Sequence, residues 1–125
     1  MIFDTDVLIW VFRGHPKAAE WVTNAPERHL SAQSYLEFLQ GAKDTLHLKA
    51  LKSFILAGHF YLLPFTENIS HRAMIYIEEY GLSHRLGAGD ALIAATAVEH
   101  GLPLVTGNAK HFKAIKDLEL KIFKP

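Results

Sequence analysis

Short apolar runs alternate along the chain with longer segments in which apolar side chains return every three or four residues. The runs at residues 2–3, 29–31, 60–63, 104–106 and 118–123 predict strands. The longer segments predict helices over residues 17–24, 34–41, 43–57, 66–80 and 89–101. Strands that alternate with helices indicate a parallel sheet covered on both faces. We therefore predict an α/β fold with three layers, α/β/α, around a mainly parallel sheet of four to five strands.

Local signals set the ends of several helices. Ser34 and Glu37 fit the S-x-x-E capping box, which predicts that a helix begins here. Gly81 is expected to end the fourth predicted helix. Residues 7–12 stay ambiguous, because their β-branched and aromatic side chains favour a strand, while Asp6 in front of them resembles a helix N-cap.

Two carboxylates, Asp4 and Asp6, interrupt an otherwise apolar stretch at residues 1–12. Asp4 follows the first predicted strand, and ligands bind at the carboxyl ends of strands in open α/β sheets. A purely structural explanation has Asp6 capping the next helix and Asp4 turning the chain, and for Asp6 we favour it. Asp4 fits that explanation less well, because an acid beside a buried strand needs a partner, a cation or solvent to offset its desolvation.

Composition narrows the class of protein. The 125 residues, 50% hydrophobic and 21% charged, suit one globular domain over residues 1–125. The absence of cysteine excludes disulfide frameworks, thiolate metal sites and cysteine nucleophiles. No apolar run approaches the ~20 residues that span a bilayer, and no signal-like segment is present, so we expect a cytoplasmic protein without a membrane partner. Thirteen basic and thirteen acidic side chains balance, so net charge does not indicate nucleic-acid binding.

Three acids, Asp4, Glu37 and Asp90, fall at a strand end or in the first turn of a predicted helix. Each alone has a structural explanation, as a turn residue, a capping-box partner or a helix N-terminal acid. Together they would meet at one edge of a parallel sheet, without basic partners nearby in sequence. Carboxylate oxygens are the ligands that Mg²⁺ and Mn²⁺ prefer, so the three acids predict a site for a hard divalent cation.

Four motifs in order resemble those of the PIN-domain ribonucleases of the VapC toxin type, over nearly the whole chain. Residues 2–9 (IFDTDVLI) resemble the opening strand and first acid, and residues 34–37 with Gly41 resemble the second acidic motif. Residues 90–97 (DALIAATA) resemble the third motif, the most specific of the set. Residues 104–112 (LVTGNAKHF) resemble the segment that closes the site.

The resemblance implies a metal-dependent endoribonuclease that hydrolyses RNA phosphodiester bonds, with residues 7–12 helical. It implies Mg²⁺ or Mn²⁺ on Asp4 and Asp90, directly or through water, and Glu37 as the group that positions or deprotonates the attacking water. It also implies three partners: RNA as substrate, a cognate antitoxin protein, and a second copy of the chain in a homodimer.

The closing segment departs from the family's pattern. Many relatives carry a fourth acid there, whereas this chain has Asn108 and His111. Asn108 can still orient a water through its amide oxygen, and His111 can reach phosphate or metal, so the departure bears on a second tightly held ion and not on the first. We expect Asp6 and Thr106 to order the site beside them. Four basic side chains near the motifs in sequence are candidate RNA contacts: Arg13, Arg85, Lys110 and Lys113.

Two other functions fit part of the sequence. Residues 4–8 (DTDVL) resemble the D-x-D motif of haloacid-dehalogenase-like phosphatases, in which Asp4 would be the nucleophile and Asp6 the acid/base. That chemistry also needs a later lysine and a paired acidic motif, and residues 89–92 (GDAL) carry only one acid. The second alternative is a degenerate PIN domain that binds RNA or a protein partner without cleaving it.

Overall fold

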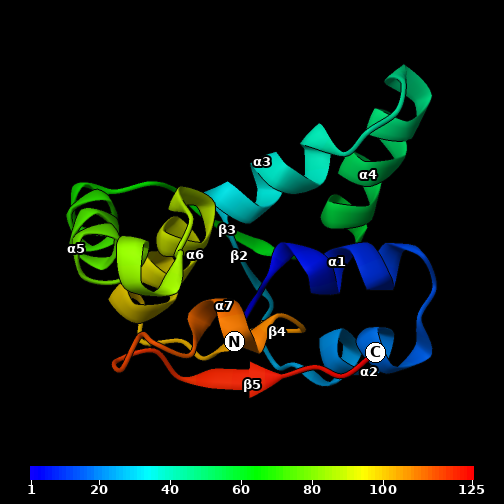
Figure 1. Ribbon diagram of the computed structural model, residues 1–125. Helices are drawn as coiled ribbons and strands as arrows, with labels where there is room; N and C mark the ends of the chain where they lie inside the picture. The colour runs from blue at the N-terminus through cyan, green and yellow to red at the C-terminus, as the bar shows by residue number, and fades with distance from the viewer.

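A five-stranded sheet lies at the centre of the computed structural model, which describes residues 1–125 (Figure 1). Every strand pair is parallel, so the predicted α/β fold with a mainly parallel sheet is confirmed. The strand order is β3-β2-β1-β4-β5. The strands are β1 (Ile2–Phe3), β2 (His29–Ser31), β3 (Tyr61–Leu63), β4 (Leu104–Thr106) and β5 (Leu120–Ile122). The direction of strand addition reverses between β1 and β4, which makes the carboxyl ends of these two strands the switch point of the sheet.

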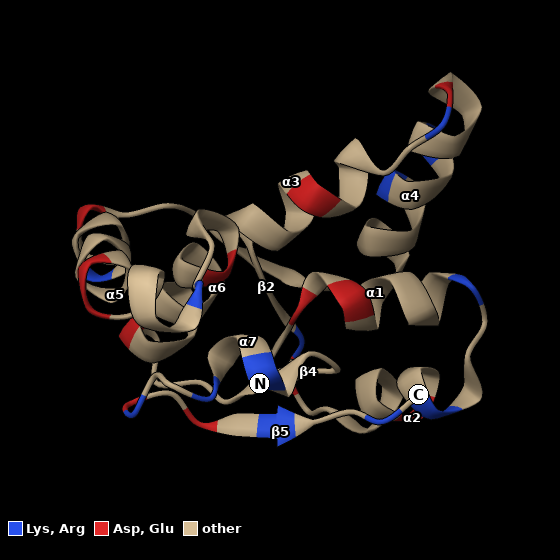
Figure 2. Cartoon of the chain, in the orientation of Figure 1, with Lys and Arg blue, Asp and Glu red and all other residues tan.

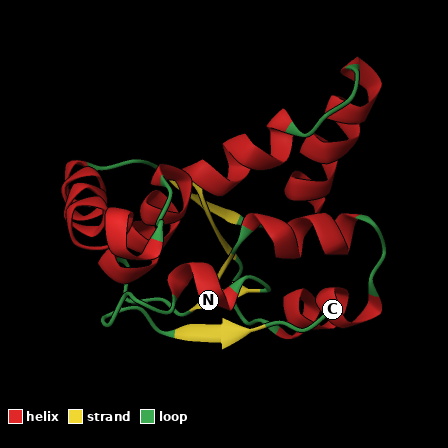
Figure 3. Cartoon of the chain, viewed as in Figure 1, coloured by secondary structure: helices red, strands yellow, loops and turns green.

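Helices cover both faces of the sheet (Figure 3). They are α1 (Thr5–Phe12), α2 (Pro16–Asn24), α3 (Ala32–Gln40), α4 (Thr45–Ala57), α5 (Glu67–His84), α6 (Ala88–Glu99) and α7 (Ala109–Phe112). Alternate residues of the central strands supply two separate cores, because successive side chains of a strand point to opposite faces. Ile2 and Leu104 pack with α5 and α6, whereas Phe3 and Val105 pack with α1 and α2. None of the helices is both long and apolar enough to cross a membrane.

Helix α1 settles the ambiguity at residues 7–12, which are helical as the family resemblance implied. The N-cap is Asp4 and not Asp6, so the capping role that we favoured for Asp6 is wrong. Asp4 directly follows β1, and its carboxylate accepts the backbone N–H of Thr5. Asp6 lies in the first turn of the helix, where its carboxylate reaches Gly107 in the loop after β4.

Helix α3 begins two residues earlier than the capping box predicted. Its N-cap is Ser31, the last residue of β2, whose hydroxyl accepts the backbone N–H of Ser34. Ser34 is therefore inside the helix, and the predicted pairing of Ser34 with Glu37 is wrong. The strand leads straight into the helix, so the cap comes from the strand's last residue, and the carboxylate of Glu37 remains available for contacts with other elements.

Helix α5 continues through Gly81, contrary to our prediction that this glycine ends the helix. The helix ends at His84, and Arg85 takes the left-handed conformation, with φ of 54°, that closes it. A glycine inside a helix costs only about 1 kcal/mol relative to alanine. Packing of α5 against α6 around the buried Ile69, Ala73 and Tyr76 offsets that cost.

Helices α3 and α4 form a hairpin that projects away from the sheet, seen at the upper right of Figure 1. The hairpin is anchored by Phe38 and Leu51, each 3% exposed, which pack in the core on the α1 side. Because α3 starts at the carboxyl end of β2, the hairpin overhangs the edge of the sheet at which the predicted acids lie.

Candidate active site

Four carboxylates gather at the carboxyl ends of β1 and β4, the switch point of the sheet. Asp4 and Asp6 open α1, Glu37 lies on α3, and Asp90 lies in the first turn of α6. Figure 2 shows acidic segments at the start of α1 and on α3, two of the helices that meet at this edge. Besides burial, the charges of Asp6 and Asp90 raise the pKa of Asp4, and the charges of Glu37 and Asp6 raise the pKa of Asp90. The three acids that the sequence predicted to converge therefore lie within electrostatic reach of one another, together with Asp6.

Asp4 is the most deeply buried of the four, with only 5% of its surface exposed. Its Oδ1 accepts the N–H of Thr5 at 2.7 Å, and its Oδ2 accepts the hydroxyl of Thr106 at 2.7 Å. Burial, followed by the charge of Asp6, raises the pKa of Asp4 to about 7, although the two hydrogen bonds oppose the shift. A positive charge placed beside Asp4 would relieve this cost.

Asp6 is held by the loop after β4. Its Oδ2 accepts the backbone N–H of Gly107 at 2.9 Å and the side-chain amide of Asn108 at 3.3 Å. Its Oδ1 is buried without a hydrogen-bond partner, and burial raises the pKa of this carboxyl. Glycine at position 107 leaves room for this carboxylate, because a Cβ there would lie 2.6 Å from the Asp6 oxygen and displace it.

Glu37 is fixed by two neighbours that sequence reasoning missed. Thr5 donates its hydroxyl to Oε1 at 2.8 Å, and Gln33 donates its amide to Oε2 at 2.8 Å. A signal was available for Gln33, which lies one helical turn before Glu37, but none for Thr5, which is 32 residues away in the sequence. Gly89, beside Asp90, lies so close that a Cβ on it would be 2.6 Å from Oε2 of Glu37.

Asp90 is paired with an imidazole from the closing segment. Nδ1 of His111, on α7, lies 3.3 Å from Oδ2 of Asp90. Burial raises the pKa of Asp90, His111 opposes this, and the charges of Glu37 and Asp6 raise the pKa further. His111 is therefore within reach of the acid cluster.

The four candidate RNA contacts are exposed and lie at helix ends around the site. Arg13 follows α1, Arg85 closes α5, Lys110 is on α7 and Lys113 follows it. None of them forms a salt bridge with the clustered acids. Among the four, Arg13 shares a cavity with Glu37. Their role in RNA binding stays a prediction.

The residues at this site fit a hydrated divalent cation better than a fully caged one. No three His, Asp or Glu side chains lie close enough together to form a ready-made metal cage. Mg²⁺ keeps several of its waters and binds proteins through one or two carboxylates. Oδ1 of Asp6 has no hydrogen-bond partner, and the pKa values of Asp4 and Asp90 are raised. Both observations are expected of clustered anionic oxygens that have no positive charge beside them, and a cation would supply that charge.

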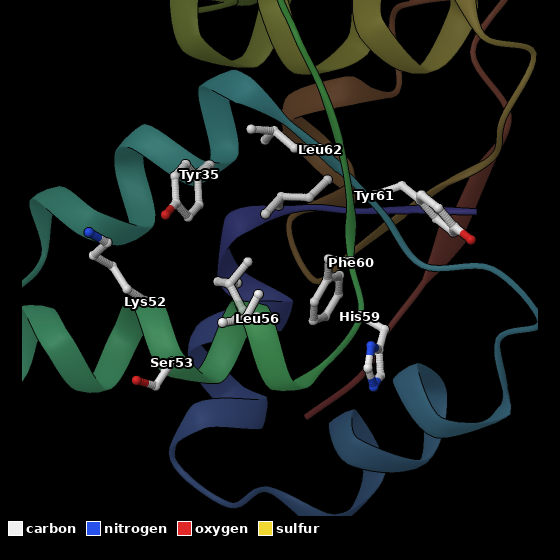
Figure 4. Close-up of a pocket in the computed structure, with 10 residues that line it drawn as sticks. Tyr35, Lys52, Ser53, Leu56, His59, Phe60, Tyr61 and Leu62 are labelled. Carbon is white, nitrogen blue, oxygen red and sulfur yellow. The ribbon is translucent and has the colours of Figure 1, made fainter.

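A larger cavity lies elsewhere. It measures about 620 Å³ and is lined mainly by apolar side chains of α4, β3 and the turn between them, among them Leu56, Leu62 and Phe60 (Figure 4). It contains no acid, and its polar groups are those of Tyr35, Lys52 and neighbouring side chains rather than a catalytic cluster. The acids at the switch point are therefore the better candidate for chemistry.

Comparison with known proteins identifies the family. The family model of the PIN domain matches residues 1–118. Ribonuclease VapC10 of Mycobacterium tuberculosis is 34% identical over 123 residues, covering 95% of this chain and 90% of that protein. Ribonuclease VapC1 of Rickettsia felis is 33% identical over 127 residues, covering 96% and 93%. A toxin–antitoxin complex from Klebsiella pneumoniae matches with a TM-score of 0.78 and 30% identity, over 99% of this chain and 96% of that one. VapBC-1 from nontypeable Haemophilus influenzae matches with a TM-score of 0.79 and 25% identity, over 98% of each chain. The chain therefore belongs to the PIN domain family, within its VapC-type group.

Proposed function

We propose that this protein is a divalent-metal-dependent endoribonuclease and the toxin of a toxin–antitoxin pair. The observation that carries the proposal is the buried Asp4, with its pKa raised to about 7, inside a cluster with Asp6, Glu37 and Asp90 at the switch point of the sheet. The names of the relatives support the reaction, since both are ribonucleases. We treat residues 1–125 as one domain, because helices from the whole chain cover a single sheet.

Asp4 and Asp90 are the residues that would hold Mg²⁺ or Mn²⁺, directly or through water, by their carboxylate oxygens. A bound divalent ion neutralises charge on the scissile phosphate and lowers the pKa of a coordinated water. Thr106 keeps Asp4 in place through the hydrogen bond to its Oδ2, and the Gly107 N–H does the same for Asp6. These contacts fix the anionic oxygens before substrate arrives, which favours a preorganised site.

Glu37 is the general base in this proposal. Thr5 and Gln33 each donate to one of its oxygens and so fix the plane of the carboxylate. Each carboxylate oxygen retains a second lone pair, with which Glu37 can accept a hydrogen bond from the attacking water and then take its proton. The phosphodiester P–O bond breaks as the new P–O bond to that water oxygen forms, and the leaving oxygen departs with the other RNA fragment.

The proposed partners are RNA, an antitoxin and a second copy of the chain. The similar solved structures include toxin–antitoxin complexes, which supports a protein inhibitor. Helix α5 exposes Met74, Ile75 and Ile77, with 59%, 49% and 37% of their surfaces accessible. Exposed apolar patches of this kind support a homodimer. We place the protein in the cytoplasm, where both RNA and a co-expressed antitoxin are found.

The two alternatives differ in how far the observations support them. A phosphatase of this type would need a lysine beside its nucleophile Asp4, and no lysine forms a salt bridge with Asp4. Membership of the PIN domain family also argues against this alternative. The other alternative, a PIN domain that binds RNA or a protein partner without cleaving RNA, is distinguished from a ribonuclease by the experiment below.

The decisive experiment incubates the purified protein with end-labelled RNA in Mg²⁺, in Mn²⁺ and in EDTA. We expect cleavage in either metal and none in EDTA. Asp90→Asn should abolish cleavage, whereas Glu78→Gln, which changes an exposed acid on α5, should not. Absence of cleavage by folded wild-type protein in both metals, across structured and unstructured RNAs, would establish the non-catalytic alternative.

A further inference from the structure

A small cavity lies beside Glu37, between α1 and the hairpin of α3 and α4. Its volume is about 150 Å³. Apolar and aromatic side chains, an imidazole and two charged groups line it, among them Phe38, Leu51, Phe12, His47, Arg13 and Glu37. The cavity therefore borders the acid cluster and shares the proposed general base with it.

One wall of the cavity is made of two rings. The centroids of Phe12 and His47 lie 5.9 Å apart, with 44° between the ring planes. Nδ1 of His47 accepts the backbone N–H of Lys43 at 3.0 Å. In the neutral imidazole the proton is then on Nε2, which makes His47 a hydrogen-bond donor at its other nitrogen. The wall thus combines aromatic surface with one N–H group.

Size and chemistry together limit what the cavity can hold. Pockets for drug-sized ligands are about 300–1,000 Å³, so 150 Å³ suits a single planar ring system. Nucleobases stack on Phe and His rings and on Arg guanidinium groups, and their edges accept hydrogen bonds from such N–H donors. Because Glu37 borders both the cavity and the acids, a nucleotide that places its base here has its phosphate next to the site of cleavage.

Building on the proposed ribonuclease function, we infer that this cavity binds the base of an unpaired nucleotide adjacent to the scissile phosphate. The base packs against Phe12 and His47, and Arg13 contacts the adjoining backbone phosphate. A base inside a helical duplex cannot enter, because its faces are covered by stacked neighbours and its edge is paired. Phe12, Arg13 and His47 thus become the residues that select where the RNA is cut.

Binding tests this inference without relying on cleavage. The protein is titrated into fluorescein-labelled hexaribonucleotides of A, C or U, and into counterparts of each that lack one base. The buffer contains Ca²⁺, which prefers oxygen ligands as Mg²⁺ does. Loss of the base at one position should weaken binding to the wild-type protein at least about fivefold, the lower end of what one stacked base contributes. Phe12→Leu and His47→Gln should bind the intact and the abasic RNA equally. Lys49→Gln changes an exposed residue of α4, the helix that carries His47, and this variant should bind intact RNA more tightly than abasic RNA, as the wild type does.

The outcomes separate this inference from the proposed function. Wild-type protein that binds intact and abasic RNA alike overturns the inference. The inference is also overturned if the folded Phe12→Leu and His47→Gln variants still bind intact RNA more tightly than abasic RNA. A cavity that binds a polypeptide would give this result. Melting curves check the fold of each variant, and His47→Gln suffices if Phe12→Leu fails to fold. The protein could bind abasic RNA more weakly, lose this difference in the Phe12→Leu and His47→Gln variants, and yet cleave no RNA in Mg²⁺ or Mn²⁺. That result overturns the proposed function and supports this cavity as a base site.

Discussion

At the scale of single residues, Asp4 destabilises the fold that contains it. Its pKa is about 7 in the folded protein and about 4 in an unfolded chain. Between these values the folded state holds a proton that the unfolded state has released, so the free energy of unfolding falls as pH rises from about 4 to about 7. Above that range the full cost of the buried charge remains. Asp6 and Asp90, whose pKa values are also raised, act in the same direction.

We therefore predict that Asp4→Asn stabilises the protein at pH 8 in EDTA. The free energy of unfolding should rise by on the order of 2 kcal/mol, and the melting temperature should rise with it. Asparagine keeps an oxygen for the Thr5 N–H and removes the charge. Calorimetry from pH 5 to pH 8 should show the wild-type melting temperature falling and that of the variant falling less. Mg²⁺ at pH 8 should stabilise the wild type and leave Asp4→Asn nearly unchanged. A wild-type melting temperature that climbs from pH 5 to pH 8 would contradict the assignment.

His111 sets a second prediction, because its Nδ1 lies 3.3 Å from the Asp90 carboxylate. Imidazole is a better ligand for Mn²⁺ than for Mg²⁺, and it replaces a carboxylate that would attract Mg²⁺. We expect faster RNA cleavage in Mn²⁺ than in Mg²⁺, and His111→Asp should raise the rate in Mg²⁺. Initial rates in the two metals measure this. If His111→Asp and His111→Ala both match the wild type, His111 has no part in the site.

At the scale of elements, two glycines in helices have opposite roles. Gly89 in α6 leaves room for Glu37, and a Cβ there would lie 2.6 Å from its Oε2. Gly81 in α5 needs no such space, since a Cβ there would make an ordinary contact with Ile77 at 3.4 Å.

Gly89→Ala should reduce RNA cleavage at least about tenfold, because the displaced Glu37 loses its alignment. Gly81→Ala should leave the rate unchanged and stabilise the protein by about 0.5–1 kcal/mol through helix propensity. Both effects are measured on the same preparations, by kcat/KM and by urea unfolding. Equal activity of the two variants would show that the position of Glu37 is not critical.

The elements also show where sequence reasoning works and where it stops. Alternation of apolar runs located all five strands. The three central strands, β2, β1 and β4, are mainly buried, and a buried parallel strand has little freedom in composition. Helix ends were harder to predict: Ser34 and Gly81 carry local signals that tertiary contacts override. At the site, Asp4 could be found from its place after a strand, and Glu37 and Asp90 from their places near the start of predicted helices. The Thr5–Glu37 and His111–Asp90 contacts could not, because they join residues far apart in the sequence.

At the scale of the whole molecule, the proposed activity predicts that the protein inhibits the growth of a cell that produces it. Expression of the wild-type chain alone should arrest bacterial growth, and co-expression of its antitoxin should restore it. Asp90→Asn should be harmless at equal protein levels. Growth curves with quantified expression measure this, and unimpaired growth in the presence of abundant, RNA-cleaving wild-type protein would exclude the toxin role.

The position of β1 in the middle of the sheet has a consequence for the nascent chain. Asp4 accepts a hydrogen bond from a threonine 102 residues later, and β1 pairs with β4 as well as with β2. At synthesis rates of about 5–20 residues per second, roughly 5–20 s pass between translation of the first acid and translation of its partner. During that interval Asp4 lacks its threonine partner and β1 lacks the neighbouring strand β4, so the complete acid site cannot form before residue 106 has been translated.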